Sequence, residues 1–188
     1  MWQTFIDWDK QLFLFINGHH SPFFDNVMMV FSATWIWTPL FLIILWLLFQ
    51  SYGLKKTVYL LLFSALLIAL SDRTSVVLFK DVFLRLRPCH NPEWEGKLHL
   101  INNYCGGQYG FISSHACNHF ALVTFLFPLL YKKHKWVVSG LIIWASFVAY
   151  SRVYLGVHYP ADVFVGSIIG ILIGTLISLL IQKTHILQ

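Results

Sequence analysis

The sequence predicts an all-α fold: a polytopic transmembrane helical bundle of about five spans, plus an N-terminal interfacial amphipathic helix. Hydrophobic residues make up 57% of the 188 residues, and charged residues only 11%. Typical soluble proteins carry about 25% charged residues. The composition therefore excludes a soluble globular domain and a disordered chain. It also excludes a free nucleic-acid binder, despite the net charge of +5, and the expected partner of most of the surface is the lipid bilayer.

Apolar residues recur at helical spacing in the N-terminal segment, at Phe5, Leu12, Phe13 and Ile16. Asp7, Asp9 and Lys10 interrupt the apolar character, so the segment lacks the clean core and small-residue cleavage site of a signal peptide. An amphipathic helix of this kind is expected to lie in the membrane interface, and Asn17-Gly18 is expected to end it. The alternative is a sixth, short span.

Five apolar runs are candidates for crossing a bilayer core, which needs about 20 residues. They are Val27–Phe49, Thr57–Phe79, His115–Tyr131, Trp136–Tyr150 and Val163–Ile181. Pro39 inside the first run is expected to be tolerated because neighbouring helices in a bundle satisfy the freed backbone group. No internal repeat or second domain is apparent, so residues 1–188 are expected to form one membrane-embedded domain with a core of about 27–182.

The distribution of lysines predicts the orientation of the chain in the membrane. With five spans, one side carries six lysines and no acidic residue: Lys55, Lys56, Lys132, Lys133, Lys135 and Lys183. Short loops rich in lysine stay on the cytoplasmic side. The C-terminus is therefore expected in the cytoplasm, and the loops 81–112 and 151–162 are expected to face the periplasm or exterior.

The chain has four arginines, all near the outer ends of spans: Arg73, Arg85, Arg87 and Arg152. Basic residues near hydrocarbon tend to be functional, and arginine suits phosphate oxygens. Lys80 and Arg87 are seven residues apart, which predicts that both lie on one helix face. Arg73 is expected on the same face, about 10 Å deeper, or else paired with a neighbouring acid. Arg85 is rotated away and is interpreted as an interfacial anchor.

A second cluster precedes the third span, where Ser113, Ser114 and His115 follow a glycine-rich stretch, Gly106–Gly110. A helix N-terminus is a ready anion site, and serine is a favoured N-cap. The two serines are therefore candidates for binding an anion. The alternative is that they only cap the helix and that His115 is an interfacial histidine. The glycine-rich stretch is interpreted as a flexible lead into the helix.

A third cluster lies before the last span, at Arg152, His158 and Asp162. Pro160 suits the first position of a helix, which places Asp162 in the first turn and near His158. A carboxylate on one imidazole nitrogen fixes the tautomer and leaves the lone pair of the other nitrogen free to attack. Beside the two other clusters, His158 is interpreted as a nucleophile.

The three clusters together resemble the type 2 phosphatidic acid phosphatase (PAP2) family of membrane lipid phosphatases, which is related to the vanadium haloperoxidases. The motif Lys-x6-Arg-Pro is matched by Lys80 and Arg87-Pro88, and the motif Ser-Arg-x5-His-x3-Asp by Ser151-Arg152, His158 and Asp162. The remaining motif, Pro-Ser-Gly-His, appears as Ile112-Ser113-Ser114-His115.

The resemblance implies a lipid phosphatase that uses no metal and no cofactor. His158 would attack phosphorus and form a phosphohistidine, Asp162 would orient it, and His115 would protonate the leaving oxygen. The phosphate-binding residues would be Lys80, Arg87, Ser113, Ser114 and Arg152. Ile112 and Ser114 depart from the family's proline and glycine, and the departures could change the rate or the choice of substrate because glycine lets a backbone approach a ligand closely.

Four lipid phosphates fit an outward-facing site in the cell (inner) membrane. Undecaprenyl diphosphate and a lipid A phosphate are favoured, and phosphatidylglycerophosphate and phosphatidic acid remain open, as do the preference for a mono- or diphosphate and the oligomeric state. The residues 81–112 contain Cys89 and Cys105, which either form a disulfide or stay free.

A metal site is the main alternative. His115 and His119 are four residues apart on one helix face, and with His158 and Asp162 they would complete four zinc ligands. That combination would favour a metal-dependent membrane hydrolase or a metal transporter. His119 could instead lean toward a substrate or fill a polar gap.

Overall fold

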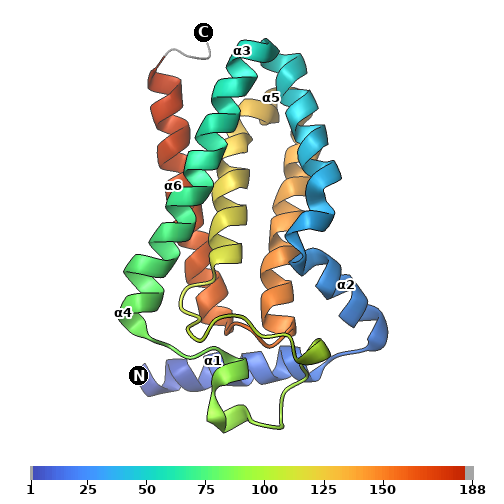
Figure 1. Ribbon diagram of the computed structural model, residues 1–188, viewed down its shortest axis with the longest axis vertical. Helices are drawn as coiled ribbons and strands as arrows, with labels where there is room; N and C mark the ends of the chain where they lie inside the picture. The colour runs from blue at the N-terminus through green and yellow to red at the C-terminus, as the bar shows by residue number, and fades with distance from the viewer. Residues whose placement is uncertain (1, 185–188) are drawn as a thin grey trace.

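The computed structural model describes residues 2–184 and is built from helices (Figure 1). The principal helices are α1 (Trp2–Gly18), α2 (Pro22–Ser32), α3 (Thr38–Arg73), α4 (Asp81–Phe83), α5 (Ser114–Tyr154) and α6 (Pro160–Lys183). A 3-10 turn, Thr34–Trp37, precedes α3, and a π-helix, Thr74–Lys80, joins α3 to α4. Three further 3-10 turns lie in the segment before α5: Pro88–His90, Pro92–Trp94 and Ile101–Asn103.

The long helices α3 and α5 each turn back on themselves (Figure 1). The α3 helix is interrupted at Gly53, whose φ of 74° is readily adopted by glycine, and α5 is interrupted at His134. When the first arm of α3 is counted from the 3-10 turn at Thr34, each arm has about 20 residues, the length that crosses a hydrocarbon core. With α6, the two hairpins give five passes. The predicted transmembrane helical bundle is confirmed, and Thr34–Phe83, Ser114–Tyr154 and Pro160–Lys183 are apolar enough to span a membrane.

The boundary of the first span differs from the prediction. Val27 belongs to the separate helix α2, which ends at Ser32, and the first pass begins only with the turn at Thr34. Pro39 lies in the first turn of α3, not in its interior. A backbone N–H is not needed in the first turn of a helix, so the proline suits the start of the helix and costs no hydrogen bond.

The helix α1 lies across one end of the bundle, as predicted for an interfacial helix and unlike a sixth span (Figure 1). Its inner face packs through Phe13, which is fully buried against Trp94 and Tyr159. Asn17 donates to the backbone oxygen of Tyr154 at 2.8 Å. The two reversals and the C-terminal end of α6 lie at the opposite end of the bundle, so the lysine-rich segments are separated from α1 by the length of the spans.

Small residues bring α5 and α6 into close contact. Gly166, Gly170 and Gly174 recur every fourth residue on α6 and face the first arm of α5. A Cβ at Gly166 would lie 2.7 Å from the backbone oxygen of Ser113, and one at Gly170 would collide with the backbone oxygen of Cys117. Helices in lipid associate through such small residues because their backbones can approach closely. This packing fixes the start of α6 beside the start of α5.

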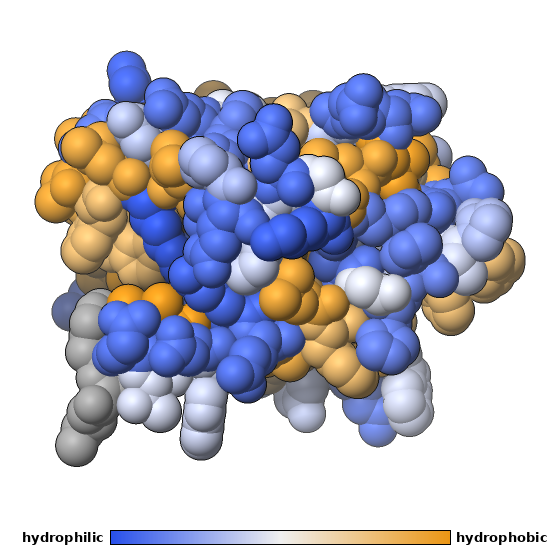
Figure 2. Space-filling view, turned by 90° about the horizontal axis from the view of Figure 1, so that it is seen from below, coloured by the Kyte–Doolittle hydropathy of each residue, from blue (hydrophilic) through white to orange (hydrophobic). Residues whose placement is uncertain are grey.

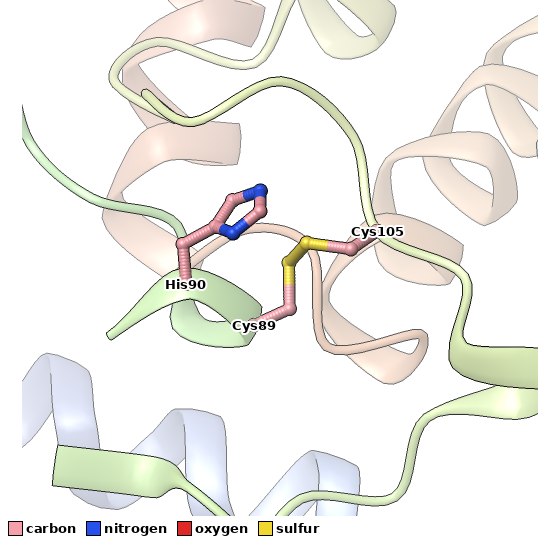
Figure 3. A group of neighbouring side chains, drawn as sticks. All are labelled: Cys89, His90 and Cys105. Atoms are coloured by element: carbon pink, nitrogen blue, oxygen red, sulfur yellow. A yellow bond between two sulfur atoms is a disulfide. The ribbon is translucent and has the colours of Figure 1, made fainter. Parts of the chain in front are cut away.

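The segment between α4 and α5 is ordered. Leu86 and Tyr109 form an antiparallel bridge, and a disulfide joins Cys89 to Cys105, which settles the alternative left open by the sequence (Figure 3). The glycine-rich stretch ends in this pairing, since the N–H of Gly110 donates to the oxygen of Arg85 at 2.8 Å. Seen from this end, polar residues cover much of the surface (Figure 2), as expected where the protein meets water.

Candidate active site

Residues from all three sequence clusters line one cavity of about 1020 Å³. Six of them surround one end of it: Lys80, Arg87, Ser114, His115, Arg152 and His158. Farther into the membrane the cavity runs between both arms of α3 and the first arm of α5, where its lining includes Ile44, Leu48, Leu61, Ile68, Leu122 and Leu126. The cavity therefore joins a cationic end to an apolar body, a combination suited to a lipid with an anionic headgroup.

Lys80 ends the π-helix and donates to Oγ of Ser114 at 2.5 Å. Oγ of Ser114 also lies 2.6 Å from Oγ of Ser75. The π-helix changes the register of side chains because its hydrogen bonds join residues i and i+5. As a result Asp72 lines the cavity and Arg73 does not, so the prediction that Arg73 shares a face with Lys80 is wrong.

Arg87 reaches the cavity from extended backbone, not from a helix. The helix ends at Phe83, and Leu84 adopts a left-handed conformation with φ of 47°. The expected arrangement of Lys80 and Arg87 on one helix face is therefore wrong, although both side chains line the cavity. Nε of Arg87 donates to the oxygen of Tyr109 at 3.3 Å. Burial, reinforced by the charge of Arg152, lowers the pKa of the Arg87 guanidinium.

Glycine makes room for the Arg87 side chain. A Cβ at Gly106 would lie 2.9 Å from Cζ of Arg87. A Cβ at Gly110 would lie 3.1 Å from Cγ of Arg87 and 3.2 Å from Oδ2 of Asp162. A larger residue at either position would therefore displace the Arg87 side chain, and at Gly110 it would also crowd the Asp162 carboxylate.

Arg152 is only 2% exposed and comes from the last turn of α5. Its Nη1 donates to Oγ of Ser32, and its Nη2 donates to the hydroxyl of Tyr104 at 3.3 Å. Its Nε has no hydrogen-bond partner within residues 2–184. Tyr104 and Ser32 were not identified from the sequence as neighbours of the site. They orient Arg152 without neutralising it, and among the described residues no carboxylate pairs with Lys80, Arg87 or Arg152.

His158 lies between Arg87 and Asp162. Nε2 of His158 is 3.1 Å from Nη1 of Arg87, and Nδ1 is 3.5 Å from Oδ2 of Asp162. Burial, together with the charges of Arg87, Arg152 and Lys80, lowers the pKa of His158 well below its ordinary value. The imidazole is thus neutral at neutral pH, with one nitrogen toward a carboxylate and the other toward the cationic end of the cavity.

A model of the PAP2 superfamily matches residues 57–186. This chain belongs to the PAP2 superfamily. The match covers all three clusters and confirms the resemblance that their motifs predicted. Helix α1 and the first arm of α3 lie outside the matched residues.

Two curated relatives of this PAP2 superfamily chain are lipid A 4'-phosphatases. The relative from Bacteroides thetaiotaomicron is 39% identical over 166 residues, which cover 87% of this chain and 72% of the relative. The relative from Porphyromonas gingivalis is 31% identical over 167 residues, which cover 88% of this chain and 70% of the relative.

Two solved structures share the fold. The PAP2-type phosphatidylglycerolphosphate phosphatase from Bacillus subtilis aligns with a TM-score of 0.69 at 25% identity, covering 96% of this chain and 87% of that one. Aquifex aeolicus LpxE aligns with a TM-score of 0.63 at 26% identity, covering 90% of this chain and 93% of that one.

One residue of the family motif does not take the position expected from the sequence. Ser113 is fully buried and is absent from the lining of the cavity. Its hydroxyl accepts from the N–H of Ala116 at 3.4 Å, and its own N–H donates to the oxygen of Asp162 at 3.0 Å. Ser113 therefore caps α5 and ties it to α6, and its side chain does not line the cavity. Ile112, in place of the family's proline, is also fully buried.

Arg85 was interpreted from the sequence as an interfacial anchor, and the structure corrects this. Its Nη1 lies 2.6 Å from Oδ1 of Asp162, and its Nη2 lies 2.6 Å from Oδ2 of Asp9. Burial lowers the pKa of Arg85, but the carboxylates of Asp162 and Asp9 outweigh it and raise the pKa overall. No local pattern indicates this contact, since it depends on the end of α4 at Phe83 and on the position of α1.

The residues of the alternative metal site do not bring three ligand atoms together. Within residues 2–184, two groups of three residues bring their ligand atoms within 4.8 Å of one another, and neither includes His115, His119, His158 or Asp162. His119 instead bonds the oxygen of His115 through Nδ1 at 2.7 Å. One of the two groups is Cys89, His90 and Cys105 (Figure 3), whose sulfurs are joined to each other and so are not thiolate ligands. The other is His20, Asp25 and His99, where Asp25 already accepts from Tyr154.

Proposed function

We propose that this protein is a membrane lipid phosphatase that removes phosphate from a lipid A-type phosphoglycolipid at the outer face of the inner membrane. The observation that carries the proposal is that three cationic side chains, Lys80, Arg87 and Arg152, line the same end of an apolar cavity as His158. Nη1 of Arg87 lies 3.1 Å from Nε2 of His158. These cations lack carboxylate partners among the described residues, and a phosphoryl group would supply the missing negative charge.

The reaction has two steps. The lone pair on Nε2 of His158 attacks phosphorus, so a P–N bond forms as the P–O bond to the lipid breaks. His115 gives its proton to the leaving oxygen. Water, deprotonated by His115, then attacks phosphorus and the P–N bond breaks, which releases phosphate and regenerates the imidazole. Asp162 keeps Nδ1 protonated and stabilises the charge that develops on the ring.

Charge stabilisation comes from side chains already in place. Lys80, Arg87 and Arg152 surround the position of the phosphoryl oxygens, and preorganised charge of this kind supplies most of the rate acceleration in many enzymes. Ser114 holds Lys80 by a hydrogen bond. Ser113 acts by capping α5, whose N-terminus faces this end of the cavity. No step requires a metal or a cofactor.

The lining of the cavity supports a phosphoglycolipid over a polyprenyl diphosphate. Asp72, Asn118 and His119 line the cavity one to two helical turns deeper than Lys80 and His115. A glycolipid presents sugar hydroxyls and amide groups below its phosphate, whereas a polyprenyl chain presents hydrocarbon at once. Polar side chains at that depth would be costly beside hydrocarbon and favourable beside a sugar. The two relatives named lipid A 4'-phosphatase support the same choice.

The distribution of lysines supports one orientation of the protein in the membrane. The site lies at the same end as α1, and the lysine-rich segments lie at the opposite end. Short lysine-rich loops remain cytoplasmic, which favours a periplasmic site and a cytoplasmic C-terminus. The Cys89–Cys105 disulfide lies at the site end, and disulfides persist in oxidising compartments such as the periplasm.

A phosphate-release assay tests the proposal. The purified protein in detergent is given a lipid A phosphate, undecaprenyl diphosphate, phosphatidylglycerophosphate or phosphatidic acid, with His158→Ala as the matched inactive control. We expect fastest release from the lipid A phosphate, inhibition by vanadate, full activity in EDTA and no release by the variant. Turnover by His158→Ala would exclude the assigned nucleophile, and loss of activity in EDTA with recovery on adding zinc would favour a metal-dependent hydrolase.

Asp72→Ala tests the substrate class. Loss of one hydrogen bond to the sugar is expected to lower kcat/KM for the lipid A phosphate by roughly tenfold, with a smaller effect on undecaprenyl diphosphate. Equal losses on both substrates would contradict recognition of a glycolipid.

A further inference from the structure

Arg85 bridges two carboxylates that come from opposite parts of the chain. One carboxylate is Asp162 at the start of α6, and the other is Asp9 in α1. Both nitrogen-to-oxygen distances are 2.6 Å. The side chains of Asp9 and Asp162 are 6% and 0% exposed, and that of Arg85 is 28% exposed. The bridge is therefore largely shielded from water, where pairing between charges is much stronger than on an open surface.

Three further contacts hold Arg85 and the two carboxylates in this arrangement. The guanidinium of Arg85 stacks on the ring of Tyr159 at 4.1 Å. The second oxygen of Asp9 accepts from the N–H of Ala161 at 2.8 Å, in the first turn of α6. Oδ2 of Asp162 accepts from the N–H of Tyr159 at 2.9 Å. Arg85 therefore contacts Asp9, Asp162 and the ring of Tyr159, and each of its two terminal nitrogens bonds a different carboxylate.

The bridge decides which oxygen of Asp162 faces His158. Nη1 of Arg85 engages Oδ1, and Oδ2 is left 3.5 Å from Nδ1 of His158. A carboxylate bonded only to the Tyr159 N–H could rotate about its Cβ–Cγ bond and lose this alignment. The guanidinium prevents the rotation, because a strong charge-assisted bond is directional.

We propose that Arg85 and Asp9 are positioning residues for the Asp162–His158 pair, so that α1 is a working part of the active centre and not only a helix at the membrane surface. The inference rests on the proposed function, since it assigns roles within the same site. Arg85 holds Asp162, and Asp9 holds Arg85 by pairing with its second terminal nitrogen. Asp9 lies outside the residues that match the PAP2 superfamily, so this support is a feature of the chain's own N-terminal helix.

A positioning role has a definite kinetic signature. The phosphate-binding cations do not contact Arg85, so substrate binding is expected to survive its replacement. The alignment of the nucleophile matters mainly in the chemical step, and a misplacement on the order of 1 Å can cost about 10²-fold in rate. The expected effect is therefore on kcat and not on KM.

The experiment compares four variants of the full chain in the lipid A phosphate release assay. They are Arg85→Gln, Arg85→Lys, Asp9→Asn and, as a matched control, Asp7→Asn. Asp7 is an exposed carboxylate on the same helix, where it bonds Gln3 at 3.2 Å. Measurements are kcat, KM, the inhibition constant of vanadate and the thermal unfolding midpoint in one detergent.

We expect Arg85→Gln to lower kcat about 10²-fold, with KM and the vanadate constant within a factor of about two. Arg85→Lys should recover at least part of the loss, Asp9→Asn should lower kcat by a smaller factor, and Asp7→Asn should match the wild type. If Arg85→Gln fails to fold, Arg85→Lys and Asp9→Asn carry the test through the same split between kcat and KM.

Three outcomes overturn the inference. Wild-type kcat in Arg85→Gln would remove Arg85 from the site, and a rise of KM at constant kcat would make it a binding residue. Equal rates for Asp9→Asn and Asp7→Asn would remove α1 from the active centre. Each of these leaves the proposed function standing, because the wild-type protein is active in the same assay. No phosphate release by the wild type from any of the four lipids would instead overturn the proposed function, and this inference with it.

Discussion

Nη1 of Arg87 lies 3.1 Å from Nε2 of His158. A guanidinium is always protonated and only donates, so Nε2 must accept and its lone pair must be present. The ring proton is then on Nδ1, which faces Asp162 at 3.5 Å. Arg87 therefore covers the lone pair of Nε2. In the proposed mechanism the same donor would shift to a phosphoryl oxygen and expose Nε2, so that one side chain would both protect the imidazole and bind the phosphoryl group.

Arg87→Met is expected to lower kcat/KM by about 10²–10³-fold, the cost of removing one preorganised donor from a developing negative charge. It is also expected to shift the pH profile. Burial lowers the pKa of His158, and the positive charges of Arg87, Arg152 and Lys80 lower it further. The imidazole is predominantly neutral only at a pH above that pKa. Losing one cation raises the pKa of His158, so the acid limb of kcat/KM moves to higher pH. Profiles that extend well below the ordinary imidazole pKa of about 6.5, as far as both proteins stay folded, measure the shift.

Lys133→Met is the charge-matched control for Arg87→Met, since Lys133 is exposed beside the reversal of α5. The control should leave the rate and the acid limb unchanged. An acid limb in Arg87→Met that stays in place, or moves to lower pH, would contradict the assignment of His158 as the neutral nucleophile facing Arg87.

His115→Gln is expected to slow release from a lipid phosphate by about 10²–10⁴-fold, the usual contribution of a general acid. The effect should nearly vanish with p-nitrophenyl phosphate, because nitrophenolate leaves without receiving a proton. The measurement is the ratio of kcat/KM for the two substrates in wild type and variant. Equal losses on both substrates would show that His115 binds phosphate and does not protonate the leaving group.

Reduction of the disulfide is expected to destabilise the protein. Cys89 and Cys105 are 16 residues apart, and closing a loop of this size stabilises a protein by about 3 kcal/mol in the chain-entropy model. Thermal unfolding with and without a reductant measures the effect. Cys105→Ser should unfold at the lower temperature of the reduced wild type, and added reductant should not lower it further; a further drop would assign the effect to another group.

Gly170→Ala is expected to destabilise the bundle by about 1–3 kcal/mol, the typical cost of overpacking, because the new methyl group would collide with the backbone of Cys117. Gly140→Ala is the matched control: a Cβ there meets nothing within 4 Å, so the change should stabilise its helix by roughly 0.5–1 kcal/mol. Unfolding midpoints in the same detergent compare the two. A neutral Gly170→Ala would contradict close contact between α5 and α6.

The sequence was sufficient to predict what depends on composition and on motif spacing. The helical bundle, the interfacial helix and the convergence of Lys80, Arg87, Arg152 and His158 on one cavity were predicted in this way. Arg85 was misinterpreted because helical periodicity was continued to Arg87. The helix in fact ends at Phe83, and the residue that follows, Leu84, has a positive φ. A leucine in this position gives no sequence signal for a helix end.

Two further differences have similar causes. The π-helix after Arg73 changes the side-chain register, and nothing in its composition marks it. Ser113 could bind phosphate or cap a helix on chemical grounds alone, and only the packing of α5 on α6 buries it. By contrast, Pro39 did carry a usable signal, since proline favours the first turn of a helix, and that signal predicts the observed start of α3 better than the apolar run does.

The disulfide joins two walls of the cationic end of the cavity. Cys89 follows Arg87-Pro88, and Cys105 lies between Tyr104 and Gly106; Arg87, Tyr104 and Gly106 all line the cavity. Such bonds form outside the cytosol and are kept reduced within it. The redox state of the compartment therefore sets how firmly this end of the cavity is held together. With the proposed periplasmic orientation, a newly made chain would gain this cross-link only after the segment 81–112 reaches an oxidising environment, so that export and assembly of the proposed site would be coupled.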